Sequence, residues 1–381
     1  MKDYGRGVNT PIQPSTTFRQ DDPRNITDEF TTGLHGPLYQ RFGHPNYEDL
    51  CVRLSKMEAG EHACLFASGI AATFALFFSQ MSVGDHMVVS SRIYGGTRGQ
   101  IAMLADKFKW KVSVVDITDH DAVRKACKKN TKIVFAEGLS NPEIIRSDVA
   151  ALAKICHSRN REILLCIDNT FTPLVLQPLL LGADVVMHSL TKYVNGRSDA
   201  MGGALVGTKE FIDALTHPTL GEAPLIGAVL HPPVAQEMAE RFYHIEYRVL
   251  EASKRASKLR ALFHGVGLRV HHHPGSSVLS VEFLTEEYGV NFVNAIARRE
   301  VDDPLLGAQP LGVSAVSLGS AHTYLWCTTR ARVENKMKKW PLLPFSPVPY
   351  GFVRVAVGYS GDFTTQFAQF KEVLNELGYP N

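Results

Sequence analysis

Between about residues 60 and 210, the chain alternates short runs rich in β-branched residues with stretches of helical period. This alternation is typical of a mostly parallel sheet, in which each crossover helix returns the chain to the edge where the next strand begins. The runs that we predict as strands are HMVVSS (86–91), KVSVVD (111–116), TKIVFAE (131–137), EILLCID (162–168), ADVVMHS (183–189) and GALVG (203–207). The pattern therefore predicts an α/β fold built on this sheet.

The segments on either side of the sheet pattern have a different character. The first 45 or so residues are rich in Pro, Thr, Gly and Asn, which predicts an irregular arm of the kind that packs on a partner subunit. From Pro233 to about His264, a long stretch without further Pro or any Gly predicts one extended helix. Strand-like SSVLSVEFL and FVRVAVG and a terminal helix near Thr364 to Leu377 then indicate a smaller α+β domain. The predicted parts are an arm (1–45), a large domain (46–232) and a C-terminal small domain (233–381).

Charge and hydropathy argue against several classes of partner. The chain has 40 basic and 38 acidic side chains, so no broad field would recruit nucleic acid or an anionic membrane. No run approaches the roughly 20 apolar residues that a membrane span needs. The N-terminal residues lack the basic start and apolar core of a signal peptide, so we expect a cytoplasmic protein.

Neither the cysteines nor the histidines predict a metal site. The six cysteines form no CxxC pair, and several lie inside apolar runs, so we interpret them as buried free thiols. The run from His271 to His273 stands before Pro274, and successive residues of an extended segment point to opposite faces. We therefore predict a turn there and no metal.

The segment after Ser68 is predicted to be a helix that packs on the sheet. Ser68 is the expected N-cap, and the apolar positions that predict the buried stripe are Ile70, Phe74, Phe77, Phe78 and Met81. The first N–H groups of a helix have no partner within it, so its N-terminus suits an anion. Ser68, Gly69 and Ile70 are therefore a candidate phosphate site.

Two strand ends carry the residues with the clearest chemistry. One predicted strand ends at Asp168, and another leads through His188 to Lys192. Ligands of open α/β sheets bind at the carboxyl ends of strands, so these two side chains are expected to meet one ligand. Alone, such an Asp is usually a turn residue and such a Lys a solvated charge. Together they suit pyridoxal 5'-phosphate, which the lysine amine holds as a Schiff base while the carboxylate pairs with the ring nitrogen.

The motifs around these residues resemble those of one enzyme family. Lys192 lies in HSLTKYVNG and Asp168 in DNTF, and both segments are similar to those of the cystathionine γ-synthase, cystathionine γ-lyase and methionine γ-lyase family. The resemblance runs from about Pro11 to Gly358. It implies a fold-type I pyridoxal-phosphate-dependent transferase with a seven-stranded sheet, in which Ser189 and Thr191 lie beside the cofactor lysine.

The resemblance also assigns residues to the cofactor. Tyr39 and Arg41 in YQRFGHP are similar to the family's pair that reaches across a dimer to the phosphate of the neighbouring subunit. Arg suits that task because its planar fork donates two hydrogen bonds at once. Tyr94 in YGGT matches the tyrosine that stacks on the cofactor ring and acts as an acid or base. Asn141 in EGLSNP, the loop that begins at Glu137, is expected near the ring oxygen.

Two residues of the C-terminal domain are expected to bind substrate. Arg354 in FVRVAVG matches the family's arginine that clamps the substrate α-carboxylate, and Ser317 in VSLG lies where the family has a second carboxylate contact. A fixed carboxylate lets the Cα–H bond align with the cofactor ring. The implied substrate is a small amino acid.

Several positions depart from the family pattern. Gly96 stands where methionine γ-lyases usually have cysteine, which counts against methionine as the main substrate. His322 replaces an acid that steers substrates, and Arg197 replaces a histidine without a functional reason that we can assign. The YGGT motif favours γ- over β-chemistry.

The resemblance implies a carbon–sulfur lyase that forms a 2-oxo acid and ammonia from cystathionine- or homocysteine-like amino acids. A γ-replacement transferase, of the cystathionine γ-synthase or O-acetylhomoserine sulfhydrylase type, is the alternative. A third hypothesis is a pseudoenzyme that binds the cofactor without turnover. The retention of four site residues disfavours it: Asp168, Lys192, Tyr94 and Arg354. The resemblance also implies a homotetramer built from dimers that share active sites.

Overall fold

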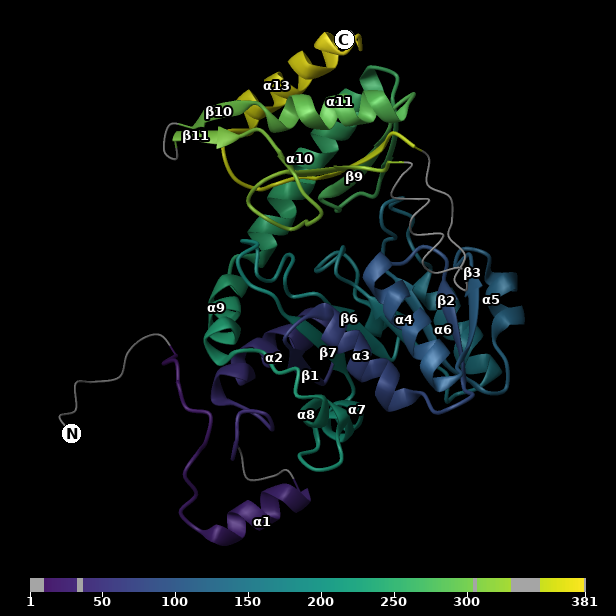
Figure 1. The fold of residues 1–381 in the computed structure, drawn as a ribbon, viewed down its shortest axis with the longest axis vertical. Coiled ribbons are helices and arrows are strands. Elements are labelled where there is room, and N and C mark those ends of the chain that lie inside the picture. Colours follow the sequence, from purple (N-terminus) through teal and green to yellow (C-terminus); the bar gives the residue numbers. More distant parts are fainter. Residues whose placement is uncertain (1–9, 33–36, 304–306, 330–349, 380–381) are drawn as a thin grey trace, which may run out of the picture.

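The computed structural model describes residues 10–32, 37–303, 307–329 and 350–379. Two main sheets organise these residues. Figure 1 shows the larger sheet and its helices below the smaller one, and α10 (Ile245–Gly265) leads from one to the other. The boundaries near residues 45 and 232 remain a prediction.

The large sheet has seven strands in the order β1-β7-β6-β5-β4-β2-β3. They are β1 (His62–Phe66), β2 (His86–Ser90), β3 (Lys111–Val115), β4 (Thr131–Glu137), β5 (Leu164–Asp168), β6 (Val185–His188) and β7 (Gly203–Gly207). Strands β2 to β6 pair in parallel, and β7 is antiparallel to both of its neighbours. The predicted mostly parallel sheet is confirmed, and each predicted run contains one of its strands.

Strand β1 lies outside the predicted runs. It has five residues, HACLF, and it lies at the edge of the sheet, where it pairs with β7 and with no other strand among the described residues. Its partner residues are more than a hundred positions later in the chain, with His62 opposite Gly207 and Phe66 opposite Gly203. Pairing over such a separation leaves no local pattern to predict it from.

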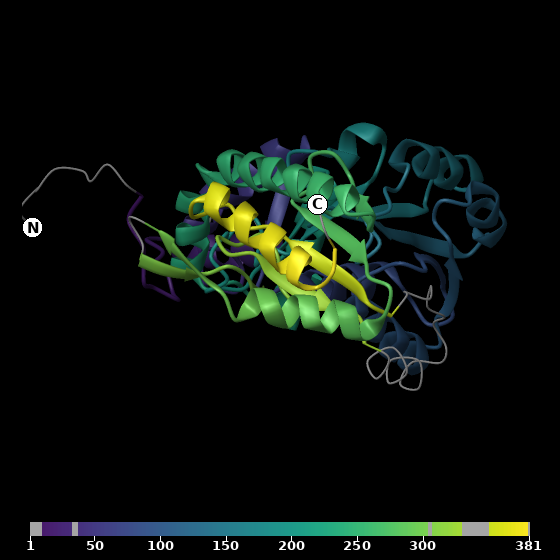
Figure 2. The same cartoon turned by 90° about the horizontal axis from the view of Figure 1, so that it is seen from above.

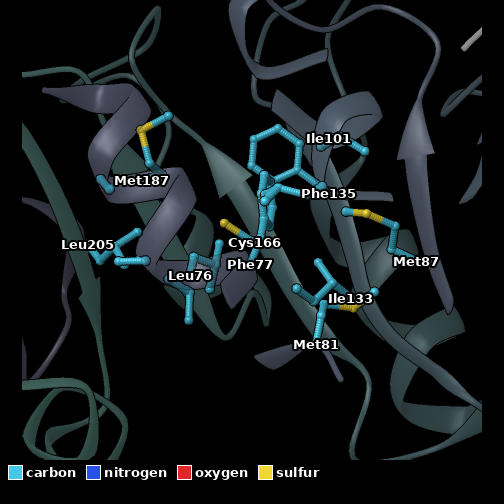
Figure 3. Packing of buried hydrophobic residues seen from close by; sticks show 14 of the residues in the cluster. Leu76, Phe77, Met81, Met87, Ile101, Ile133, Phe135, Cys166, Met187 and Leu205 are labelled. Atoms are coloured by element: carbon cyan, nitrogen blue, oxygen red, sulfur yellow. The ribbon is translucent and has the colours of Figure 1, made fainter. Parts of the chain in front are cut away.

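Helices cover both faces of the large sheet. They are α2 (Pro45–Glu58), α3 (Gly69–Gln80), α4 (Gly95–Phe108), α5 (His120–Ala126), α6 (Val149–Arg159), α7 (Lys209–Thr216) and α8 (Glu222–Ile226). Figure 3 shows how Leu76 and Phe77 of α3 pack against Phe135 and Cys166 of the sheet. The rings of Phe77 and Phe135 meet edge to face, with centroids 5.3 Å apart. This packing holds α3 on the sheet and so determines where its N-terminus lies.

Helix α3 begins where the sequence predicts but turns a different face to the core. Ser68 is the N-cap, and its Oγ accepts the Ala71 N–H at 3.1 Å. Of the predicted stripe, Phe77 and Met81 are buried, but Ile70 and Phe78 are exposed. The prediction was wrong for those two because small residues share the buried face: Ala72 and Ala75 are fully buried in the core cluster beside Leu76.

The extended helix predicted from Pro233 is two helices. Helix α9 (Pro232–Phe242) ends and α10 begins after a turn at Tyr243 and His244. The Arg248 guanidinium donates to the Arg241 carbonyl at 2.8 Å, and also to the carbonyls of Tyr193 and Val194. The Arg248 side chain thus donates a hydrogen bond to a carbonyl in the last turn of α9, where the helix itself has no further N–H groups to offer. This tertiary contact explains the break.

The C-terminal part is built on a five-stranded sheet in the order β12-β13-β14-β9-β8. Its elements are β8 (Arg269–His272), β9 (Val278–Glu282), α11 (Glu286–Ala297), the hairpin β10 (Glu300–Asp303) and β11 (Gly307–Pro310), β12 (Val313–Ser314), β13 (Tyr324–Cys327), β14 (Phe352–Ala356) and α13 (Phe363–Glu376). The view from above shows the yellow α13 on the outer side of this sheet (Figure 2). The predicted turn is wrong for His271 and His272, which lie in β8 and pair with β9.

The N-terminal arm is less irregular than predicted. Its described residues include helix α1 (Pro23–Thr32), which the Pro- and Thr-rich composition did not indicate. The segment before it is tied to α2, because Asn46 donates to the Pro11 carbonyl at 3.0 Å and accepts the Gln13 N–H at 2.9 Å. The arm prediction for residues 1–9 and 33–36 lies outside the described residues. Among the residues that are described, no helix has the length and apolar character needed to cross a membrane.

Candidate active site

A cavity of about 360 Å³ lies where the carboxyl ends of β4, β5 and β6 face the C-terminal sheet. It brings together most of the residues predicted for the site. Those that line it are Ser68, Gly69, Ile70, Tyr94, Asn141, Asp168, Ser189, Thr191, Lys192 and Arg354. The cavity therefore lies at the strand ends where the sequence argument places a ligand.

Lys192 enters the cavity from a tight turn after β6. Its N–H donates to the Ser189 carbonyl at 3.2 Å, and its Nζ donates to Ser317 Oγ at 3.1 Å. Burial and the Arg354 cation lower the pKa of the Lys192 amine to about 8, although the Asp168 carboxylate opposes this shift. The amine is therefore neutral in a far larger fraction of molecules near pH 7 than an exposed lysine.

Asp168 is the last residue of β5 and is buried. Its Oδ1 accepts the Thr170 N–H at 3.0 Å, and in the sheet it lies beside Glu137 of β4 and Met187 of β6. Burial raises the pKa of the Asp168 carboxyl, while hydrogen bonds from Thr170 oppose the rise. A cation in the cavity would favour the ionised form of this acid.

The N-terminus of α3 forms another wall, with Ser189 packed against Gly69. A Cβ on Gly69 would lie 3.0 Å from the Cβ of Ser189. On its other side is Gly203 of β7, where a Cβ would lie 2.1 Å from the Ser68 carbonyl oxygen and 2.8 Å from the Gly69 nitrogen. Glycine at 203 therefore lets the helix N-terminus approach the sheet.

Replacing Gly203 with alanine is expected to displace this N-terminus, because the clashing atoms are backbone. We expect the affinity for pyridoxal phosphate to be at least about tenfold weaker. We also expect the free energy of unfolding to fall by about 1–3 kcal/mol, as is usual for overpacking. Titration of the cofactor-free protein and thermal unfolding measure the two effects. Gly265→Ala is the control, since a Cβ there meets no atom within 4 Å. Equal cofactor affinity in both variants would contradict the assignment of this wall.

Tyr94 stands at the N-terminus of α4, and its ring is half exposed at the cavity. A Cβ on Gly96 would lie 2.4 Å from Cε1 of that ring. The absence of a side chain at Gly96 is thus what admits the Tyr94 ring in this position. The glycine that departs from the methionine γ-lyase pattern has a structural consequence for a residue of the site.

Arg354 and Ser317 meet from neighbouring segments of the C-terminal part. The Arg354 guanidinium is buried, donates to Asn141 Oδ1 at 3.2 Å and donates to the Ser317 carbonyl at 2.9 Å. Ser317 does not line the cavity itself but contacts Lys192 through its hydroxyl. Arg354, Asn141, Ser317 and Lys192 therefore form one connected group.

Two of the residues predicted to bind the cofactor lie outside this cavity. Tyr39 is exposed, and Arg41 donates to the Pro224 carbonyl at 2.9 Å beside a separate hollow of about 210 Å³. Neither lines the cavity that contains Lys192. Within one chain the structure does not bring them to the site, and their predicted service to a neighbouring subunit stays a prediction.

The substrate-side residues differ from the sequence interpretation. His322 and Arg197, the two departures from the family pattern noted in the sequence, do not line the cavity. The cavity is instead lined by apolar side chains that we did not single out: Leu139, Phe171, Met187, Met201, Val316 and Leu318. Val316 and Leu318 flank Ser317, and this alternation along an extended segment was the available signal.

The donor set fits pyridoxal 5'-phosphate. A lysine amine of lowered pKa suits the aldehyde, a buried carboxylate suits the ring nitrogen, and a helix N-terminus flanked by Ser189 suits the phosphate. Gly203 keeps the space that this helix end needs.

Comparisons with known proteins agree with this fit. The family model described as Cys/Met metabolism PLP-dependent enzyme matches residues 2–294. Methionine gamma-lyase of Arabidopsis thaliana is 30% identical over 97% of this chain and 86% of its own length. Cystathionine gamma-synthase of Mycobacterium bovis is 38% identical, over 54% of this chain and 51% of its own.

Solved structures give the same result. The crystal structure of metB from Corynebacterium glutamicum has a TM-score of 0.83 and 28% identity, and the match covers 99% of this chain and 95% of that one. The predicted fold type, family and cofactor are confirmed. This chain belongs to the family of Cys/Met metabolism enzymes that depend on pyridoxal 5'-phosphate.

Proposed function

We propose that the chain is a carbon–sulfur lyase of the cystathionine γ-lyase type, acting on cystathionine- and homocysteine-like amino acids. The observation that carries the proposal is the cavity that joins Lys192, Asp168 and Arg354 to an otherwise largely apolar wall. A cation for an α-carboxylate and apolar surface for a sulfur side chain are the features such a substrate needs.

The site residues have distinct proposed roles toward the cofactor. Lys192 binds it covalently, Asp168 pairs with its ring nitrogen, and the first turn of α3 with Ser68, Gly69 and Ile70 holds its phosphate. Ser189, Thr191 and Asn141 would contribute further polar contacts to the bound cofactor, and the Tyr94 ring would lie against it. Bound there, pyridoxal phosphate supplies an electron sink for charge that develops at the substrate Cα.

The chain's own residues then bind the substrate and move its protons. Arg354, supported by Ser317, binds the α-carboxylate and so orients the Cα–H bond. The Lys192 amine takes the Cα proton, for which its lowered pKa of about 8 suits it. Tyr94 serves as an acid or base beside the substrate side chain. For homocysteine the balance is homocysteine and water giving 2-oxobutyrate, ammonia and hydrogen sulfide.

A γ-replacement transferase on an O-acylated homoserine is the second candidate. The similarity to a cystathionine gamma-synthase, at 38% identity over about half of each chain, is the observation that favours it. Such an enzyme uses the same cofactor residues and differs in whether a thiol enters before the product leaves.

The assembly is part of the proposal. Tyr39 and Arg41 complete the phosphate site of a neighbouring copy, which makes the enzyme a homo-oligomer, with a tetramer of paired dimers as the full assembly. The exposure of Tyr39 supports this role, since 43% of its surface is accessible in its own chain. The cytoplasm is the proposed location.

The test is detection of 2-oxo acid from the purified enzyme with pyridoxal phosphate bound. The γ-lyase proposal predicts 2-oxobutyrate from homocysteine or cystathionine without added thiol. Product from O-acetylhomoserine only with added thiol would establish the transferase instead, and pyruvate from cystathionine would indicate β-cleavage. A protein that binds the cofactor but converts none of these substrates would leave a pseudoenzyme or a different substrate.

A further inference from the structure

Glu137 is a buried acid of the cavity to which the proposed function gives no role. It is the last residue of β4, and it lies beside Asp168 of β5 in the sheet register. Paired residues of neighbouring parallel strands point to the same face, so the two carboxyl groups share one side of the sheet. Both line the cavity, and Glu137 is only 6% exposed.

Glu137 holds the backbone of Tyr94. Its Oε1 accepts the Tyr94 N–H at 2.5 Å, at the point where α4 begins. Its Oε2 has no hydrogen-bond partner among the described residues. On the other side of Tyr94, Gly96 leaves space for the ring. The position of Tyr94 at the cavity therefore depends on Glu137, which accepts its backbone N–H, and on Gly96, which has no side chain to displace its ring.

The surroundings of Glu137 favour its neutral form. Burial is the main effect that raises the pKa of Glu137 well above its ordinary range, and the neighbouring Asp168 carboxylate adds to it. The Tyr94 N–H, the Arg98 cation of α4 and, more weakly, the Asn141 backbone N–H oppose the rise. Among the described residues, Lys192 and Arg354 are the other charged side chains that line the cavity. Two ionised carboxylates side by side in a buried site repel, so one of the pair keeps its proton.

We infer that Glu137 is a positioning residue that works as a neutral acid, accepting the Tyr94 N–H and so fixing the Tyr94 ring at the cavity while Asp168 carries the charge. The inference rests on the proposed function only in placing Tyr94 beside the cofactor. Neutrality matters because a second anion next to Asp168 would change the charge that the cofactor ring meets.

The experiment compares Glu137→Gln and Glu137→Met with the wild type and with Glu372→Met, a control on an exposed glutamate of α13. Glutamine keeps an uncharged oxygen acceptor, and methionine keeps the volume without one. Two quantities are measured on the holoenzyme: the visible absorption of bound pyridoxal phosphate as a function of pH, and kcat and KM for homocysteine. The spectrum needs no turnover, so this inference stays testable even if a wild type that converts neither homocysteine nor cystathionine refutes the proposed function.

The expected result is that Glu137→Met lowers kcat by about 10- to 100-fold with cofactor bound, because small misplacements of a site group cost this much. Glu137→Gln is expected to restore most of that loss and to leave the pH midpoint of the absorption band in place. A midpoint shifted by about one pH unit or more in Glu137→Gln would overturn the inference, since it would reveal a lost charge. Wild-type spectrum and turnover in Glu137→Met would overturn it as well. If Glu137→Met fails to fold, the pH midpoint of the absorption band in Glu137→Gln alone tests whether Glu137 is neutral.

Discussion

Replacing Lys192 with alanine is expected to lower 2-oxo acid formation by at least about 10³-fold, because one amine both binds the cofactor and moves the Cα proton. The cavity has no second lysine among its described lining residues, so no neighbouring amine can take over. At pH 7 a pKa of about 8 leaves roughly one amine in ten neutral, against about one in 3,000 for an ordinary lysine. The measurement is 2-oxobutyrate release from homocysteine, with the visible spectrum recorded after dialysis.

The control for this variant is Lys154→Ala, which removes an exposed lysine of α6 and leaves the cavity intact. We expect wild-type turnover and a wild-type cofactor band from it. Retention of the band by Lys192→Ala after dialysis, together with turnover above a tenth of the wild-type rate, would contradict the assignment of Lys192.

Much of this site was predictable because it depends on strand ends. Asp168 ends one predicted strand and Lys192 follows another, and parallel topology brings the carboxyl ends of these strands to one edge. Ser68 was predictable too, since an N-cap followed by an apolar helix is a local pattern. These features are encoded within a few neighbouring residues, which is why the sequence alone locates them.

Features that depend on distant contacts were not predictable. The break between α9 and α10 depends on Arg248 reaching carbonyls of Tyr193 and Val194, more than fifty residues earlier. Strand β1 exists because it pairs with β7 at the edge of the sheet. Neither contact produces a local periodicity in the sequence. The sequence therefore predicted one helix in place of α9 and α10, and no strand at β1.

The residues of the cavity wall also differ in how far the sequence predicts them. The resemblance supplied Arg354 and Asn141, but their mutual hydrogen bond joins residues 213 positions apart and appears only in the structure. Val316 was overlooked because it is an apolar residue beside the more conspicuous Ser317, whereas His322 was singled out as a departure from the family pattern and lies outside the lining. A departure from the family pattern was thus a poorer guide to the substrate side than position in the fold.

Replacing Arg354 with methionine is expected to weaken binding of amino acids by about 30-fold or more, because truncating a buried partner of a charge costs about 2–5 kcal/mol. Arg354 is 3% exposed and is held by Asn141 and the Ser317 carbonyl, so its guanidinium is oriented before a carboxylate arrives. The measurement uses the holoenzyme and two probes that perturb the cofactor spectrum: L-norvaline, and butylamine, which is the same molecule without the carboxylate.

The two probes separate a carboxylate clamp from a structural role. If Arg354 binds the carboxylate, the apparent dissociation constant for L-norvaline rises while that for butylamine changes by less than about threefold. The comparison also cancels any change in Lys192, whose pKa Arg354 lowers, since both amines meet the same lysine. Arg299→Met is the control, because Arg299 pairs with Glu372 and Glu376 outside the cavity. Equal weakening of both probes in Arg354→Met would show that the arginine supports the cavity without binding substrate.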